Sequence, residues 1–119
     1  MTLGIVWNSV TDWFDDYQPI FNDDYTTEAF GRRSREILEK QQSAPQFLYL
    51  SLNAPHDPVL APPELRQHYR AMFPTAPDSR VELLASIRAI DIEMEKIVKL
   101  VSVGVEKLLC STHISLGSR

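Results

Sequence analysis

The chain has 119 residues and a formal net charge of −4, with 44% hydrophobic and 24% charged residues. This composition is typical of one soluble globular domain of modest size. The acidic balance and the lack of a basic patch argue against nucleic-acid binding. No apolar run approaches the roughly 20 residues of a membrane-spanning helix. Residues 1–8 lack the pattern of a signal peptide, and a single cysteine excludes an internal disulfide, so the compartment stays undecided.

The amino-terminal part combines a short apolar run with an acidic segment. Residues 2–7 are compatible with a short strand. Residues 12–24 carry five aspartates among four aromatic side chains. Calcium binding is one interpretation, but the spacing and the glycine of an EF-hand loop are absent. We expect a solvated acidic loop held by its aromatic side chains.

A helix is predicted over residues 27–42. Thr26 or Thr27 can cap its first turn, and apolar positions recur at helical spacing from Phe30. Several arginines lie on its other face. Such a cluster can hold sulfate or phosphate, but a solvated charged face is the favoured interpretation. Ser43-Ala44-Pro45 then ends the helix.

The most informative stretch is a buried strand over residues 46–52 followed by a proline-rich loop. The strand is nearly continuous in apolar residues, which is typical of a parallel sheet covered by helices on both faces. His56 follows it between Pro55 and Pro58. Ligands of open α/β sheets bind at the carboxyl ends of strands. His56 is therefore a candidate for hydrogen bonding to a charged ligand or for acid–base chemistry. An ordinary loop histidine bonded to a backbone carbonyl is the equal alternative.

Two more helices are predicted. Pro63 begins a short one that extends to about Tyr69. A long one begins at Asp78 or Ser79, where Ser79 and Glu82 have the spacing of a capping box, and ends near Gly104. Its predicted apolar stripe comprises Leu83, Leu84, Ile87, Ile90, Met94, Ile97, Val98 and Val101. One parallel strand among three helices is too little sheet for a complete α/β domain, so we expect part of a larger one.

No complete catalytic motif is present. His68 is expected at the surface, and His113 has no informative context. Cys110 is expected to be inert, because no neighbour in sequence would lower its pKa. The sequence contains neither a glycine-rich phosphate loop nor a zinc-binding motif nor a Gly-X-Ser-X-Gly elbow.

At Phe47-Leu-Tyr-Leu-Ser-Leu-Asn-Ala-Pro-His-Asp-Pro58 the chain resembles the sulfatase family, in particular its arylsulfatase B-like branch. Three further elements agree in order: Tyr25-Thr-Thr-Glu-Ala-Phe30 before the strand, Pro62-Pro-Glu64 after it, and a long helix containing Asp91. Thr27 matches the threonine of the first element. The resemblance covers roughly residues 20–104.

This resemblance implies an alkaline-phosphatase-like α/β fold and hydrolysis of aryl or sugar sulfate esters. It also implies a calcium ion and a formylglycine made from the cysteine of a Cys-X-Pro-Ser-Arg motif. The residue matched by His56 binds the substrate sulfate. Members of the family are usually lysosomal or secretory.

The departures from the family pattern are equally specific. The sequence has no Cys-X-Pro-Ser-Arg motif, and Cys110 is followed by Ser-Thr-His. The calcium ligands of the family, including an Asp-Asn-Gly expected after Gly104, are absent. We therefore predict that residues 1–104 are a central fragment of a sulfatase-like domain and that 105–119 form a divergent tail, arising from truncation, splicing or a frameshift. The isolated chain is expected to be inactive. The alternative is a non-catalytic module that binds a protein partner through exposed strand edges.

Overall fold

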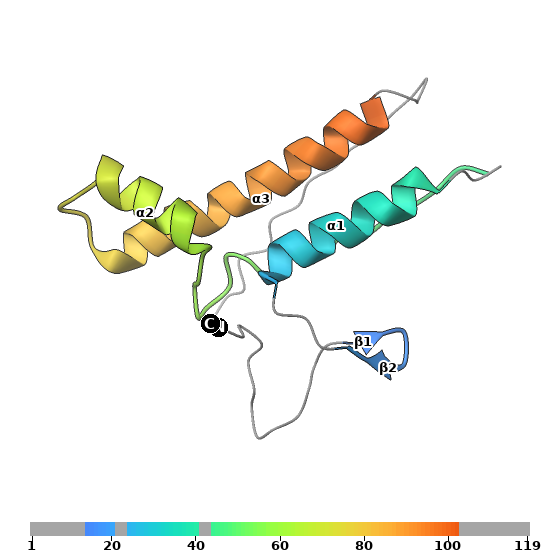
Figure 1. Cartoon of the computed structure of the whole chain (residues 1–119), viewed down its shortest axis with the longest axis horizontal. Helices are drawn as coiled ribbons and strands as arrows, with labels where there is room; N and C mark the ends of the chain where they lie inside the picture. The colour runs from blue at the N-terminus through green and yellow to red at the C-terminus, as the bar shows by residue number, and fades with distance from the viewer. Residues whose placement is uncertain (1–13, 21–23, 41–43, 103–119) are drawn as a thin grey trace.

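The computed structural model describes residues 14–20, 24–40 and 44–102. Its elements are β1 (Phe14–Asp15), β2 (Gln18–Pro19), α1 (Thr26–Glu39), α2 (Pro63–Met72) and α3 (Asp78–Ser102). Figure 1 shows α1 and α3 side by side and running in the same direction, with α2 folded back on the first part of α3. The predicted strand at 2–7, Gly104 and the predicted tail lie outside the described residues.

All three predicted helices are present with ends close to those expected, but the predicted caps are wrong. Tyr25, not a threonine, precedes α1 as its N-cap, and its side chain makes no capping hydrogen bond. Thr26 and Thr27 both lie inside the first turn. The helix α3 already begins at Asp78, and within the described residues no hydrogen bond joins Ser79 to Glu82. Glu82 instead accepts a hydrogen bond from Arg66 of α2, at 3.0 Å.

The contact between α1 and α3 is made by small residues. Thr27, Gly31 and Ser34 are buried on α1 at spacings of four and three residues, which places them on one face. The buried residues of α3 repeat mainly at four-residue spacing and comprise Val81, Ala85, Ser86, Ala89, Glu93 and Ile97. Small side chains on both faces let the two helices approach closely.

The predicted apolar stripe of α3 is therefore offset from the face that is buried. Of its members only Ile97 is buried, whereas Leu83, Ile87 and Val98 are exposed. The buried face carries the small residues Ala85 and Ala89 together with Glu93, which contacts Gly31 and Arg35 of α1, and the bulkier residues occupy neighbouring faces of the helix.

A buried ion-pair group crosses the contact between α1 and α3. Glu93 of α3 is only 1% exposed. Its carboxylate accepts hydrogen bonds from Arg35 of α1 and, at 2.5 Å, from Lys96 of α3. Gly31 makes room for it, because a Cβ at that position would lie 2.7 Å from Glu93 Cδ. Burial raises the pKa of Glu93, but the two cationic donors outweigh it and leave the pKa below its usual value.

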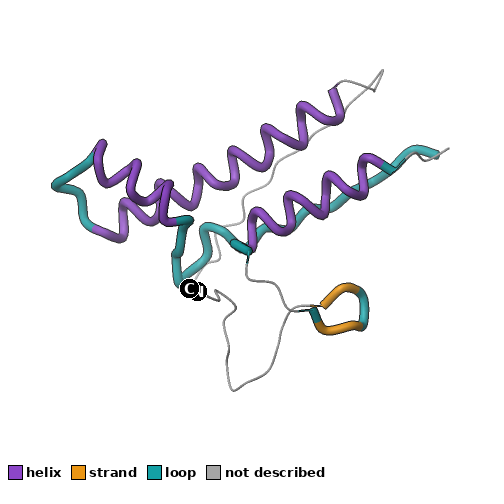
Figure 2. The backbone as a smooth tube through the Cα atoms, in the orientation of Figure 1, coloured by secondary structure: helices purple, strands orange, loops and turns teal. Residues whose placement is uncertain are grey.

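The predicted parallel strand at 46–52 is not formed among the described residues. Residues 45–53 lie outside any helix or strand, and Figure 2 shows this segment returning along α1 as a loop. Its side chains still alternate, with Leu48, Leu50 and Leu52 partly buried and Phe47 92% exposed. The residues therefore retain the two-residue period of a strand, but a parallel strand requires neighbouring strands, and the described segments supply none.

The strand pairing that the structure does contain is a short antiparallel hairpin. Phe14 pairs with Pro19 and Asp15 with Gln18. Asp16 in the turn has φ of 56°, a left-handed conformation that aspartate tolerates better than most residues. Phe14 and Tyr17 are exposed, so the prediction that aromatic side chains hold the acidic segment in place is wrong for these two.

Candidate functional site

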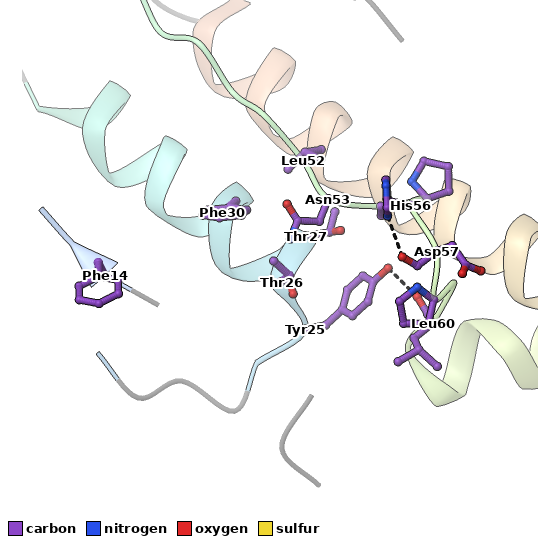
Figure 3. Close-up of a pocket in the computed structure, with 13 residues that line it drawn as sticks. Phe14, Tyr25, Thr26, Thr27, Phe30, Leu52, Asn53, His56, Asp57 and Leu60 are labelled. Atoms are coloured by element: carbon purple, nitrogen blue, oxygen red, sulfur yellow. Dashed lines mark hydrogen bonds between the residues drawn. The ribbon is translucent and has the colours of Figure 1, made fainter. Parts of the chain in front are cut away.

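The first turn of α1 and the proline-rich loop after residue 52 enclose an open pocket. Its volume is about 520 Å³. Figure 3 shows the pocket between the start of α1 and the loop that carries His56. The residues lining it are Phe14, Tyr25, Thr26, Thr27, Phe30, Leu52, Asn53, Ala54, Pro55, His56, Asp57, Pro58 and Leu60. The Tyr25–Phe30 segment and the His56 loop, which both match the family pattern, thus meet at one site. Most of α1 and the segment after it separate them in sequence.

His56 is held by two local hydrogen bonds. Its backbone N–H donates to the Asn53 carbonyl oxygen at 2.8 Å, closing a turn. Its ring Nδ1 lies 2.7 Å from the Asp57 carbonyl oxygen. Because a carbonyl oxygen only accepts, this contact places a proton on Nδ1. Nε2 is then the second ring nitrogen, and it carries a proton only when the ring is an imidazolium.

Both alternatives considered for His56 are therefore compatible with its geometry. The bond to a backbone carbonyl is the one expected of an ordinary loop histidine. The same bond fixes the orientation of the ring and leaves Nε2 for a ligand. In functional histidines, a hydrogen bond at one ring nitrogen sets the role of the other in this way. The side chain is exposed and lines the pocket, so Nε2 is accessible.

Tyr25 connects the two walls of the pocket. Its hydroxyl donates to the Leu60 carbonyl oxygen at 2.9 Å, across 35 residues of sequence. Burial raises the pKa of the Tyr25 hydroxyl, which keeps it protonated as a donor at neutral pH. The bond fixes the start of α1 relative to the His56 loop. In the sequence, Tyr25 stood out only as part of the family pattern, and this contact was not predicted.

Thr27 is the most buried polar residue of the pocket. It is 0% exposed, and a side-chain hydrogen bond with Tyr25 lowers the pKa of the Tyr25 hydroxyl, an effect smaller than that of burial. The sequence predicted a capping role for it, which the position of the helix start rules out. The threonine matched to the family pattern is therefore a pocket hydroxyl.

The arginines of α1 are engaged by carboxylates. Arg32 pairs with Asp24 at 2.5 Å, and Arg33 pairs with Asp15 at 3.4 Å and with Glu36 at 3.2 Å. Arg32 and Arg33 remain about half exposed. Arg35 is bound to Glu93, and none of these three arginines lines the pocket. These contacts favour the charged-face interpretation over an arginine site for sulfate or phosphate.

The other candidates lie apart from this pocket. His68 is exposed on α2, where its ring makes an edge-on contact with Tyr69 at a centroid distance of 5.3 Å. Asp91 is exposed near the middle of α3. Cys110 and His113 lie outside the described residues.

A calcium site does not fit the described part of the chain. No group of three or more histidine, cysteine, aspartate or glutamate side chains is arranged there to hold a metal ion. Asp15 and Asp24 are instead bound to arginines. Among the same residues, no helix is long and apolar enough to cross a membrane.

A comparison with known protein families adds a decisive observation. The sequence model of the family described as Sulfatase matches residues 5–107. The chain belongs to the sulfatase family. This match includes α1, the His56 loop, α2 and α3, which are the elements that build and support the pocket. Membership fits an alkaline-phosphatase-like α/β fold, of which the described residues show the helices and not the parallel sheet. No solved structure matches the chain.

Proposed function

We propose that the pocket at the start of α1 is the sulfate-ester site of a sulfuric ester hydrolase of the arylsulfatase B-like branch, with His56 as a substrate-binding residue. The substrate class is an aryl or sugar sulfate. The observation that supports this most strongly is that His56 and Thr27 line one pocket. Both residues occupy matched positions of a family pattern, and nothing in their separation along the chain requires them to meet.

The geometry of His56 suits the developing charge of sulfate-ester cleavage. The Asp57 carbonyl oxygen holds Nδ1, so an imidazolium would direct its remaining N–H, at Nε2, toward the pocket. An N–H placed there stabilises negative charge on a sulfuryl oxygen or on the leaving ester oxygen. The aromatic side chains of Phe14, Tyr25 and Phe30 line the remainder of the pocket and offer apolar surface to an aryl or sugar ring.

This chain supplies part of that site and not the whole. Hydrolysis breaks the sulfur–oxygen ester bond and requires a nucleophile, which the family makes from a Cys-X-Pro-Ser-Arg motif that these 119 residues do not contain. The described residues also offer no calcium site. We therefore propose that the chain alone binds a sulfate ester and does not turn it over.

Phenyl sulfate tests this proposal. Isothermal titration of the full chain is expected to give saturable binding that His56→Gln weakens and His68→Gln leaves unchanged. His68 is a matched control because it is an exposed histidine outside the pocket. Equal affinities for the two variants would contradict the role of His56. Hydrolysis of an aryl sulfate by the chain, dependent on added calcium, would contradict the proposed lack of turnover.

A further inference from the structure

The main chain of residues 46–52 is open to strand pairing. This segment belongs to no helix or strand and lies along α1 (Figure 2). Among the described residues, its N–H and carbonyl groups form no hydrogen bond with another main-chain group. Main-chain hydrogen bonds resume at the turn in which the His56 N–H donates to the Asn53 carbonyl oxygen. Free main-chain groups along an extended segment are a template for pairing with another strand.

The side chains divide the segment into two faces. Leu48, Leu50 and Leu52 are partly buried, whereas Phe47 is 92% and Tyr49 80% exposed. One face thus packs on the protein, and the other presents two aromatic rings to water. The segment contains no charged residue, so its approach to an identical segment brings no like charges opposite each other. These features favour the addition of a second strand.

We infer that residues 46–52 are a self-association edge, at which a second copy of the chain adds its own residues 46–52 in antiparallel pairing. Such an edge is complementary to itself, because the two copies exchange hydrogen-bond donors and acceptors across a twofold axis. The second copy is therefore the occupant that the segment itself specifies. The inference does not rest on the proposed function, since only Leu52 of these residues lines the pocket.

The alternation of the side chains sets the register of the pairing. A twofold axis through Tyr49 uses the whole segment and places Leu48 of one copy opposite Leu50 of the other, on the face that packs against the protein. The two Tyr49 side chains then lie opposite each other, and each Phe47 lies diagonal to the Tyr49 of the other copy, within reach of an aromatic contact. A shift by one residue would turn the leucine face of one copy to the aromatic side of the other.

The size of the contact makes the dimer weak. Two aromatic side chains from each copy, at about 150–250 Å² each, offer about 600–1,000 Å². Rings on one face of a two-stranded ladder cover one another only in part, so the buried area lies below the roughly 1,200 Å² of stable specific interfaces. The ladder itself adds about six to eight main-chain hydrogen bonds. We therefore expect a dimer that dissociates on dilution.

Sedimentation velocity of the full chain over a wide concentration range measures this association. The sedimentation coefficient of the wild type is expected to rise with concentration from the monomer value to the dimer value. Tyr49→Lys removes an aromatic pair and places like charges opposite each other at the axis, so it is expected to weaken association roughly tenfold or more. Tyr17→Lys is the matched control, because Tyr17 is 93% exposed on the hairpin and outside the segment. It is expected to associate like the wild type.

Cysteine cross-linking tests the register independently. In a Cys110→Ser background, Tyr49→Cys places two sulfur atoms across the axis, within the distance that a disulfide bridges. Phe47→Cys places them four residues apart along the ladder, about 13 Å, which is beyond that distance. Under mild oxidation Tyr49→Cys is expected to form a covalent dimer and Phe47→Cys to remain monomeric.

The inference fails if the sedimentation coefficient of the wild type does not depend on concentration. It also fails if Tyr49→Lys associates like the wild type, or if Tyr17→Lys weakens association equally, since exposed aromatic side chains would then act without regard to the segment. Equal cross-linking of Tyr49→Cys and Phe47→Cys would refute antiparallel pairing through Tyr49. Circular dichroism of each variant verifies that the helices are retained.

Discussion

Replacement of Gly31 by alanine tests the contact that places α1, and with it the pocket, on α3. A Cβ on Gly31 would lie 2.7 Å from Glu93 Cδ and 2.8 Å from Glu93 Cγ. Carbon atoms in favourable contact are about 3.5–4.0 Å apart, so the added methyl group overlaps the glutamate by about 1 Å. Glu93 has little freedom to move, since it is 1% exposed and bound by Arg35 and Lys96.

The expected magnitude follows from opposing effects. Overpacking a well-filled contact costs about 1–3 kcal/mol, and displacing Glu93 would also disturb a buried ion pair, whose disruption costs about 3–5 kcal/mol. Alanine gains about 1 kcal/mol over glycine inside a helix. We therefore expect Gly31→Ala to lower the free energy of unfolding by about 2 kcal/mol, because steric overlap exceeds the propensity gain.

The effect should reverse when the glutamate side chain is removed. In a Glu93→Ala background the overlap is gone, and Gly31→Ala should stabilise the chain by about 1 kcal/mol through helix propensity. Urea unfolding followed by circular dichroism measures all four chains. Glu95→Ala is the control background, because Glu95 is exposed and forms its salt bridge with Lys99 of its own helix, away from Gly31. A stabilising effect of Gly31→Ala in the wild type would refute the described contact between α1 and α3.

Three further predictions follow from the same structure. The pKa of Glu93 lies below its usual 4.5, so its ionised carboxylate contributes fully to the free energy of unfolding above that pH. The contribution is lost as the pH falls through the lower pKa of the folded state. Glu93→Gln should therefore make the free energy of unfolding, measured with urea, less dependent on pH in acid. Arg70 of α2 donates to the carbonyl oxygen of Ala76, in the turn before α3, at 2.6 Å. Arg70→Met should lower the free energy of unfolding by about 1–2 kcal/mol in the same assay. An unchanged midpoint would mean that the bond is not formed. Phe47 and Tyr49 are 92% and 80% exposed on an extended segment that pairs with no strand among the described residues. Replacing both by lysine should reduce self-association, measured by analytical ultracentrifugation, without loss of helix. Unchanged self-association would contradict this.

The helices could be predicted from the sequence because their signals are local. Pro63 begins α2 where expected, and apolar spacing with a break at Ser43-Ala44-Pro45 located α1. The buried face of α3 could not be predicted, because hydrophobicity favours Leu83 and Ile87 over Ala85 and Ala89. Which face is buried depends on the approach of α1, and that is a property of the tertiary contact.

The strand and the site show the same division between local and distant causes. The apolar run after Gln46 predicted a buried strand, but pairing depends on neighbouring strands that the described segments do not provide. His56 was identified as a candidate from its place after that run. The bond from Tyr25 to Leu60 joins residues 35 positions apart along the chain, and no local pattern indicates it.

The affinity of the full chain for phenyl sulfate tests the central claim most directly. Nδ1 of His56 donates to the Asp57 carbonyl oxygen, which leaves Nε2 as the ring nitrogen for a ligand in the pocket. Isothermal titration should give saturable binding in the wild type and in His68→Gln. His56→Gln should bind roughly tenfold more weakly or worse, the scale of one hydrogen bond to a charged group. A wild-type affinity that His56→Gln leaves unchanged would contradict a sulfate-binding role for His56.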